Sequence, residues 1–355
     1  MLVVATLMLS ACGGGGGGGG GSTSTPSNPQ TPASPPAAAS STVQTSVPSP
    51  SYAAGTMQAA AFSQLNAYRL PMGVGEVAQD PILDTTAQAH ATYLNANFAN
   101  RNITALSHDE VSTYADYYND TPLDRADKAG APPPEWIGEA VTDSTQTTAT
   151  AAGSDCVVKM LDTVYHLDAL TDSQQTVGIG FTPVSAQVGF DVCNFDFGST
   201  TGVYGTPGAN SIPVFGGQQM ATTAVATVPL ANETGVALSM AAESPAPVPS
   251  FTSPGRPLMV RVNAASAGDV LTVSSFTLTN PSGNVVSGEI MIPSGAASGS
   301  TGTAVVDPNG VLGQGVVFFI PAQPLTANTV YTATFNGARD SAPISKSWTF
   351  TTGAN

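Results

Sequence analysis

Three histidines occur in the chain of 355 residues, His90, His108 and His166. Imidazole changes its charge nearest to neutral pH, so these residues are the first candidates for metal ligands or general bases. His108 lies in the stretch "TALSHD" and is followed by Asp109 and Glu110. A lone histidine beside carboxylates also suits a purely structural role, held by hydrogen bonds. Which interpretation applies to His108 depends on the helices, strands and loops that position it.

The segment 80–101, "DPILDTTAQAHATYLNANFANR", predicts a helix that would carry His90. Asp80 is a favourable N-cap, and Pro81 suits the first helical position. Apolar residues recur at helical spacing at Leu83, Ala87, Ala91, Leu94 and Phe98. His90 lies beside this apolar face, so we expect it at the edge of the core.

Further helices are predicted at 56–69, 121–130 and 154–167, while 107–139 is otherwise rich in loops. The stretches "TVGIGFTP" and "AQVGFDVCNFDFG" predict two strands, because β-branched and aromatic residues dominate them. Helices on both sides of a few antiparallel strands give an α/β fold with three layers, α-β-α. A continuous helix over 154–167 would place Asp162 and His166 on one face.

Seven motifs follow one another in this part of the chain: "FSQLNAYR", "QDPILDTTAQAHA", "LSHD", "TPLDRADKAGA", "WIGEAV", "MLDTVYHL" and "QTVGIGF". Their order and spacing resemble the CAP superfamily, also called SCP-like extracellular domains. The resemblance covers about residues 56–197. It implies an α-β-α sandwich with a central cleft that two histidines and one or two acids line.

The resemblance assigns cleft positions to particular residues. His108 matches the histidine of the family's "FSH" motif, and Glu139 matches the acid of "GEN". His166 matches the second family histidine, and Asp162 lies four residues before it, at the edge of the cleft. The chain departs from the family where Ala140 replaces the asparagine of "GEN". The family's second acid is also absent, which puts in doubt any activity that needs all four groups.

Three functions remain open from these residues. Two imidazoles and a carboxylate suit Zn²⁺ or another divalent cation, with His108, His166 and Glu139 as candidate ligands. Such a site would bind weakly and reversibly, and less well on acidification, because neutral imidazole is the metal-binding form. The resemblance also implies lipid or cell-envelope ligands.

The second function is hydrolysis, with a histidine–carboxylate pair as general base. Ser107 is a poor nucleophile for it, because adjacent residues of an extended loop point to opposite sides. The chain also lacks the GxSxG pattern of serine hydrolases. The sequence therefore assigns no catalytic residue. The third function is structural, in an envelope protein whose cleft is vestigial.

The first residues, "MLVVATLMLSAC", resemble the lipobox of bacterial lipoproteins, in which Cys12 would carry the lipid. An ordinary signal peptide with a chance cysteine is the alternative, and the usual basic region is missing. Residues 12–52 are rich in Gly, Pro, Ser and Thr, so we expect a disordered tether. The resemblance implies a lipid-anchored protein of the cell envelope, sorted to the outer membrane or cell surface because position 13 is not aspartate.

The composition limits the classes of binding partner and predicts the oxidation state of the cysteines. The net charge is −15, with 24 acidic and 9 basic residues, which argues against a nucleic-acid partner. If Cys12 carries lipid, Cys156 and Cys193 remain as a pair. In an oxidising compartment such a pair predicts one disulfide. Membrane association would then come from the lipid alone.

The pattern changes after residue 251, where seven short strands separated by turn sequences predict an immunoglobulin-like β-sandwich. Residues 201–247 allow no firm interpretation; they either extend the first sheet or connect the two domains. The predicted division is a signal peptide at 1–11, a tether at 12–52, a CAP-like domain at 53–200, a connecting segment at 201–247 and an Ig-like domain at 248–355.

Overall fold

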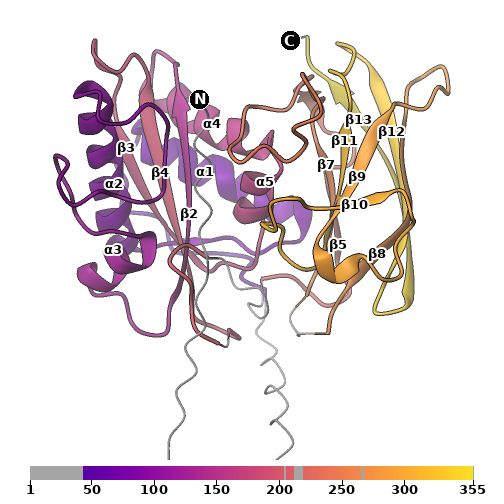
Figure 1. Cartoon of the computed structure of the whole chain (residues 1–355), viewed down its shortest axis with the longest axis horizontal. Helices are drawn as coiled ribbons and strands as arrows, with labels where there is room; N and C mark the ends of the chain where they lie inside the picture. Colours follow the sequence, from indigo (N-terminus) through magenta and orange to yellow (C-terminus); the bar gives the residue numbers. More distant parts are fainter. Residues whose placement is uncertain (1–42, 204, 212–218, 265–267, 355) are drawn as a thin grey trace, which may run out of the picture. The chain divides into compact units, whose positions relative to one another are not determined.

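The computed structural model describes residues 43–203, 205–211, 219–264 and 268–354, which all belong to one compact unit. The predicted signal peptide and most of the tether lie outside the described residues, as does nearly all of the strand-like stretch "SIPVFGG". Helices and strands are mixed, and the strands form three open sheets (Figure 1).

The first sheet has the order β1-β3-β4-β2. Its strands are β1 (Ala78–Gln79), β2 (Trp136–Ser144), β3 (Thr176–Thr182) and β4 (Asp191–Ser199). β1 pairs parallel with β3, and the other pairs are antiparallel. β2 therefore forms one edge of this sheet.

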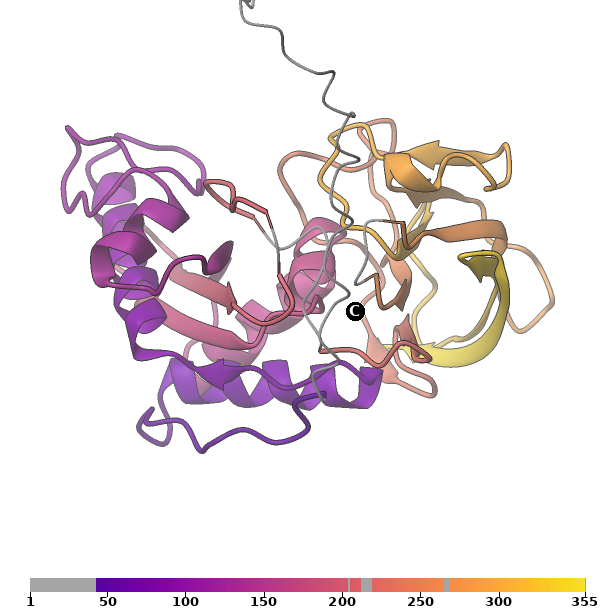
Figure 2. The ribbon, with the colours of Figure 1, turned by 90° about the horizontal axis from the view of Figure 1, so that it is seen from below.

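Helices cover both faces of the first sheet (Figure 2). They are α1 (Met57–Arg69), α2 (Pro81–Ala99), α3 (Pro122–Ala129), α4 (Ala149–Leu161) and α5 (Tyr165–Leu170). α1 and α4 share the larger core, whereas α2 and α3 pack on the opposite face. The backbone of α2 approaches β3 closely, because a Cβ at Gly178 or Gly180 would lie within about 2 Å of it. Among the described residues, none of the helices combines the length and the apolarity that crossing a bilayer requires.

Local sequence signals fix the helix boundaries. The Thr56 side chain caps α1 by accepting from Ala59 N–H, and Asp80 caps α2 by accepting from Ile82 N–H. The prediction of an Asp80 cap followed by Pro81 is confirmed. α3 ends at Ala129 and is capped by Gly130, whose φ of 97° lies in the left-handed region that glycine adopts without strain.

The predicted continuous helix over 154–167 is wrong. α4 ends at Leu161, and α5 begins only at Tyr165. Thr163 Oγ1 donates back to Met160 O, and the backbone N–H groups of residues 164–166 turn toward Glu243. Asp162 and His166 therefore do not share a helix face.

A disulfide joins Cys156 of α4 to Cys193 of β4, with 6.4 Å between the Cα atoms. Both residues are fully buried. The bond fixes a covering helix to the sheet beneath it, as predicted from the cysteine count.

The remaining strands form two sheets that pack against each other. One has the order β10-β9-β11-β7-β5, and the other has the order β6-β13-β12-β8. Their bounds are β5 Val225–Val228, β6 Thr234–Val236, β7 Leu258–Val262, β8 Leu271–Thr279, β9 Gly288–Ile292, β10 Ala304–Val306, β11 Val316–Pro321, β12 Val330–Arg339 and β13 Ala342–Thr352. Apolar side chains from both sheets, among them Phe276, Phe335 and Trp348, form one core between them.

All seven strands predicted after residue 251 are present. The connecting segment adds two more, because β5 pairs with β7 and β6 pairs with β13. Part of it therefore belongs to the β-sandwich. Another part, near residues 209–211, contacts the first sheet, where Ser211 N–H donates to Ile137 O.

The short helix α5 contacts the β-sandwich through buried polar groups. The Asp168 carboxylate pairs with the guanidinium of Arg261 and accepts from Gly313 N–H. Tyr165 donates from its hydroxyl to Asp307 at 2.6 Å. These contacts fix α5, which carries His166, against the sandwich.

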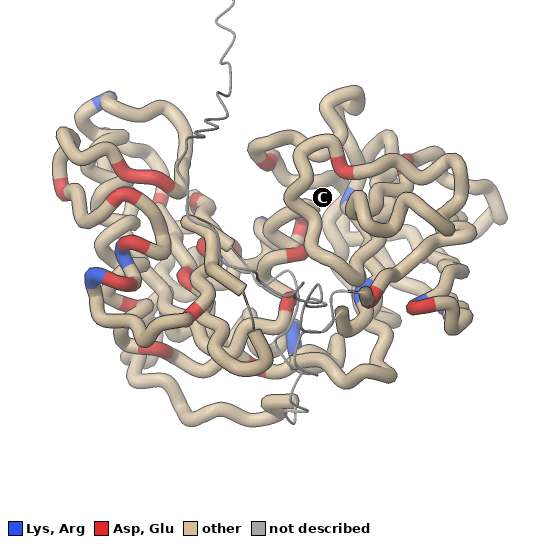
Figure 3. Tube along the Cα trace, turned by 60° about the horizontal axis from the view of Figure 1, so that its bottom comes forward, with Lys and Arg blue, Asp and Glu red and all other residues tan. Residues whose placement is uncertain are grey.

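Acidic side chains outnumber basic ones over the described chain (Figure 3). Four of the 9 basic residues are also buried, namely Arg69, Arg125, Arg256 and Arg261. Seven of the 24 acidic residues are buried as well, so burial removes charges of both signs from the surface, which keeps an excess of acids.

Glu135 is a buried carboxyl beside the N-terminus of α2. It is 5% exposed, and its Oε1 would lie only 2.1 Å from a Cβ at position 198, which is glycine. Burial, together with the charge of Asp80, raises the pKa of Glu135 from its ordinary value of 4.5 to about 7. Ionised Glu135 is therefore unfavourable in the folded protein.

Glu135→Gln is expected to stabilise the protein at pH 8 by about 1–2 kcal/mol, after a discount for screening by solvent. A raised folded-state pKa costs stability as pH rises from the unfolded value toward the folded one. The advantage of the variant should therefore grow between about pH 4.5 and 7 and then remain constant. Urea unfolding of both proteins across this range measures it; equal stabilities at pH 8 would contradict the prediction.

Candidate functional site

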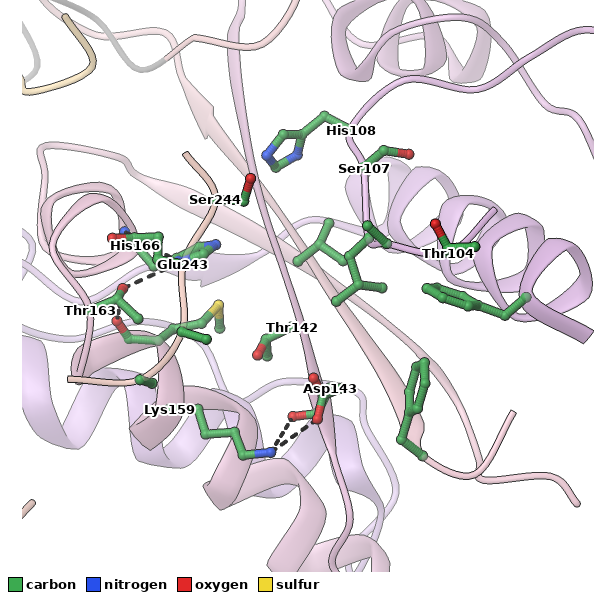
Figure 4. A pocket seen from close by; sticks show the side chains of 18 residues that line it. Thr104, Ser107, His108, Thr142, Asp143, Lys159, Thr163, His166, Glu243 and Ser244 are labelled. Carbon is green, nitrogen blue, oxygen red and sulfur yellow. Dashed lines mark hydrogen bonds and ion pairs between the residues drawn. The ribbon is translucent and has the colours of Figure 1, made fainter. Parts of the chain in front are cut away.

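A pocket of about 590 Å³ lies beside the free edge of β2 (Figure 4). The loop 104–108 forms one wall, and the end of α4, the residues after it and the segment 241–244 form the other. Its lining residues with polar side chains are Thr104, Ser107, His108, Thr142, Asp143, Lys159, Thr163, His166, Glu243 and Ser244. Phe98, Leu106 and Phe190 make one end of the pocket apolar.

His108 reaches the pocket from the loop, and its side chain is 41% exposed. Its Nδ1 lies 2.9 Å from Oε1 of Glu139, whose side chain is completely buried. The other carboxylate oxygen of Glu139 accepts from Arg125 at 2.6 Å and from Asn194 at 3.0 Å. Both oxygens are thus engaged, and Glu139 orients the imidazole from behind.

Buried charges determine the ionisation of this carboxylate. Burial alone would raise the pKa of Glu139, but the charges of His90 and Arg125 and the hydrogen bond from His108 bring it well below its usual range. The pKa of neighbouring Asp196 moves the opposite way, because burial and the charge of Glu139 raise it well above normal. Glu139 is therefore the anion of the pair, and Asp196 is a neutral acid.

His90 is buried behind the pocket between two acceptors. Its Nδ1 lies 2.9 Å from Oε1 of Glu110, and its Nε2 lies 2.8 Å from the carbonyl oxygen of Ser107. Two acceptors suit a ring that carries a proton on each nitrogen. Nε2 is also 3.7 Å from Glu139, so a protonated His90 would add a second cation beside this carboxylate.

Two buried side chains, His90 and Arg125, hold the loop that carries His108. The Ser107 carbonyl accepts from His90, and the His108 carbonyl accepts from Arg125 at 3.0 Å. Prediction from the sequence placed His90 at the core edge and did not find this role. Glu110, its partner, lies 20 positions away, and helical spacing carries no information about such a contact.

His166 lies on the other wall of the pocket and has its own carboxylate. Its Nδ1 is 2.8 Å from Oε1 of Glu243. The same carboxylate accepts from the backbone N–H groups of Val164, Tyr165 and His166 at 2.8–3.0 Å. Burial would raise the pKa of Glu243, but these hydrogen bonds and the charge of His166 lower it. Prediction from the sequence missed Glu243 because it lies 77 positions from His166.

The predicted site residues thus fall into two groups and an outlier. His108 and Glu139 are in contact, whereas His166 faces the same pocket with Glu243 as its partner. Asp162 does not line the pocket, because its carboxylate pairs with Arg256 at 2.5 Å. Among the described residues, no group of three or more His, Cys, Asp or Glu could hold a metal ion.

Both pocket histidines have the same orientation toward their carboxylates. Each is engaged through Nδ1, and among the described residues Nε2 of neither ring has a hydrogen-bond partner. A carboxylate that accepts from one ring nitrogen fixes the tautomer of the neutral ring and leaves the lone pair on the other nitrogen. Each ring therefore offers the pocket an Nε2 lone pair, which can bind a metal ion, accept a hydrogen bond or accept a proton.

No family model matches the chain, and no curated protein sequence matches it at a significant level. The case for a function therefore rests on these residues and their geometry.

Proposed function

We propose that this is a ligand-binding protein of the cell envelope. In this proposal the helix–sheet part is a CAP-like α-β-α sandwich, and the β-sandwich is an immunoglobulin-like module that displays it. The helices on both faces of the first sheet and the two packed sheets of the second part support this architecture. Histidines at the two family cleft positions, both lining one pocket, support the CAP-like assignment.

One observation carries the binding function: two imidazoles face one pocket, and a buried carboxylate holds each of them through Nδ1. A volume of about 590 Å³ lies within the range of small-ligand sites. The ligand would donate hydrogen bonds to the two Nε2 atoms, or be coordinated by them, and would place apolar groups against Leu106 and Phe98. The ligand classes are a divalent cation such as Zn²⁺, a lipid, or another envelope component. Glu139 would support a bound cation through His108, since both of its oxygens are already engaged.

The histidines can be tested directly because the chain has only three. In ¹H–¹⁵N correlation spectra, the neutral rings of His108 and His166 should show the Nδ1–H tautomer, because each ring contacts its carboxylate through Nδ1. Zn²⁺ should perturb the Nε2 signals of His108 and His166 and leave His90 unchanged, since Nε2 of His90 is engaged by Ser107.

Calorimetric titration of Zn²⁺ into the full-length protein supplies the affinity. His108→Gln and His166→Gln should each weaken binding, and acidification to pH 5.5 should weaken it further, since protonated imidazole binds no metal. Asp162→Asn, outside the pocket, is the matched control. A double histidine variant that binds Zn²⁺ as well as the wild type would refute the metal class.

Attachment to the envelope is a separate part of the proposal. Cys12 would carry lipid, because "LSAC" is followed directly by the Gly-rich tether. A palmitate analogue fed to cells should label the wild type, and Cys12→Ala should lose both the label and the membrane association. Labelling that persists in the variant would exclude this anchor.

A hydrolase is the second candidate, and the His108–Glu139 pair is the observation that favours it. An anionic carboxylate on Nδ1 leaves Nε2 free to take a proton from a nucleophile. Covalent labelling by a fluorophosphonate that His108→Gln abolishes would support hydrolysis over simple binding. Absence of labelling in the wild type would argue against a serine nucleophile.

A further inference from the structure

The free edge of β2 supplies main-chain groups to the pocket. β2 is the last strand in its sheet, and its described pairing partner is β4. Val141, Thr142 and Asp143 of this strand line the pocket wall. Figure 4 shows Thr142 and Asp143 on the strand that crosses the pocket.

Alternation along the strand identifies which groups face outward. In an antiparallel ladder the N–H and C=O of one residue point to the same side, and successive residues alternate. Ile137 and Glu139 point away from β4, because Ile137 O accepts from Ser211 N–H and Glu139 N–H donates to Asn210 Oδ1, both at 2.8 Å. By the same parity, Val141 and Asp143 also point outward, into the pocket.

The outward groups of Val141 lack a partner among the described residues. Val141 is only 6% exposed, so its N–H and C=O are largely removed from bulk solvent. Buried main-chain groups without a partner are unfavourable, and water or a ligand normally satisfies them. The carbonyl of Asp143 marks the end of this unpaired stretch, because it accepts from Lys159 Nζ at 3.1 Å.

We propose that the ligand of the pocket is an extended polypeptide segment that adds to β2 as a new edge strand. This inference rests on the proposed function and names its ligand class. The outward N–H and C=O of Val141 can pair with the C=O and N–H of one residue of an extended peptide. Such main-chain hydrogen bonds supply the affinity in strand addition. The chain itself already places main chain against the same edge, where Ser211 pairs with Ile137.

The two walls of the pocket would read alternate side chains of the added strand. One face of the extended sheet meets Leu106, Phe98 and His108, and the other meets Met160 and His166. Side chains of a strand point alternately to the two faces. The peptide would therefore place apolar residues toward Leu106 and Phe98, and hydrogen-bonding residues within reach of the two Nε2 atoms.

The test uses random linear decapeptides displayed on phage and selected on the full-length protein. Val141→Pro removes the outward N–H without removing a hydrogen bond to β4, and proline is tolerated on strand edges. This variant should lower the affinity for the selected peptides by about tenfold or more, because a buried hydrogen bond is lost. Val141→Ala keeps the N–H and is the matched control. Circular dichroism and thermal unfolding check that both variants fold.

N-methylation of the selected peptides gives an independent measurement that needs no protein variant. N-methylation of the alternate peptide residues whose N–H groups face β2 should abolish binding. N-methylation of the intervening residues should be tolerated. Selection of no peptide, or binding that ignores both Val141→Pro and the methylation pattern, would overturn the inference. Loss of binding in His108→Gln and His166→Gln alone would leave the proposed pocket standing and refute strand addition. Loss of binding in Val141→Pro alone would support strand addition and would count against a role of the two histidines in binding.

Discussion

Replacing Arg125 by methionine is expected to lower the free energy of unfolding by about 3–5 kcal/mol, the cost of leaving a buried charge without its partner. Arg125 is fully buried, donates to Glu139 at 2.6 Å and lies 3.8 Å from Glu110. It also holds the carbonyl of His108. The variant should therefore lose both stability and the fixed position of His108.

Urea unfolding monitored by circular dichroism measures this loss. Arg101→Met is the matched control, because Arg101 is exposed and should change stability by less than about 0.5 kcal/mol. The double variant Arg125→Met with Glu139→Gln should lose less unfolding free energy than the two single variants lose together, since it removes a cation and its anion at the same time. The penalty should also shrink at acid pH, where a protonated Glu139 needs no cation. Strict additivity would show that the two groups are not coupled.

Removing the disulfide is expected to have an effect of similar size. The bond spans a sequence separation of 37 residues, for which the chain-entropy model gives about 3–4 kcal/mol. Cys156→Ala with Cys193→Ala should lose this stability, because the unfolded chain regains its freedom and α4 is no longer tied to β4.

Chemical unfolding with and without reductant distinguishes the bond from the packing of the two side chains. Reductant should lower the free energy of unfolding of the wild type, whose disulfide is reduced once the chain unfolds. It should leave the free energy of unfolding of the double variant unchanged. Cys12→Ala is the control and should unfold like the wild type. Mass spectrometry under non-reducing conditions should show Cys156 linked to Cys193, and two free thiols after export would contradict the pairing.

Glu243 connects the proposed pocket to the rest of the chain. It comes from the connecting segment, yet its carboxylate fixes His166 and the start of α5. α5 in turn pairs with the β-sandwich through Asp168 and Arg261. The geometry of the second histidine therefore depends on residues far outside the predicted CAP-like region, and studies of binding require the full chain.

The sequence by itself determined the elements whose signals are local. Asp80 and Pro81 mark the start of α2 because capping acts within one turn of helix. The seven strands after residue 251 follow from short-range composition and turn residues. The cysteine count predicted the pair Cys156 and Cys193. His108 and Glu139 could be placed together only through their resemblance to a family.

Tertiary structure decided the partners of these groups. The helix that would carry both Asp162 and His166 is interrupted where Glu243 accepts the N–H groups of residues 164–166. The Asp162 carboxylate pairs with Arg256 and not with His166. The protonation of Glu139 likewise depends on His90 and Arg125. Such pairings join residues tens of positions apart. Helical or strand periodicity reports only which side of an element is buried, whereas the strength of a buried charge pair depends on the position of both partners in space.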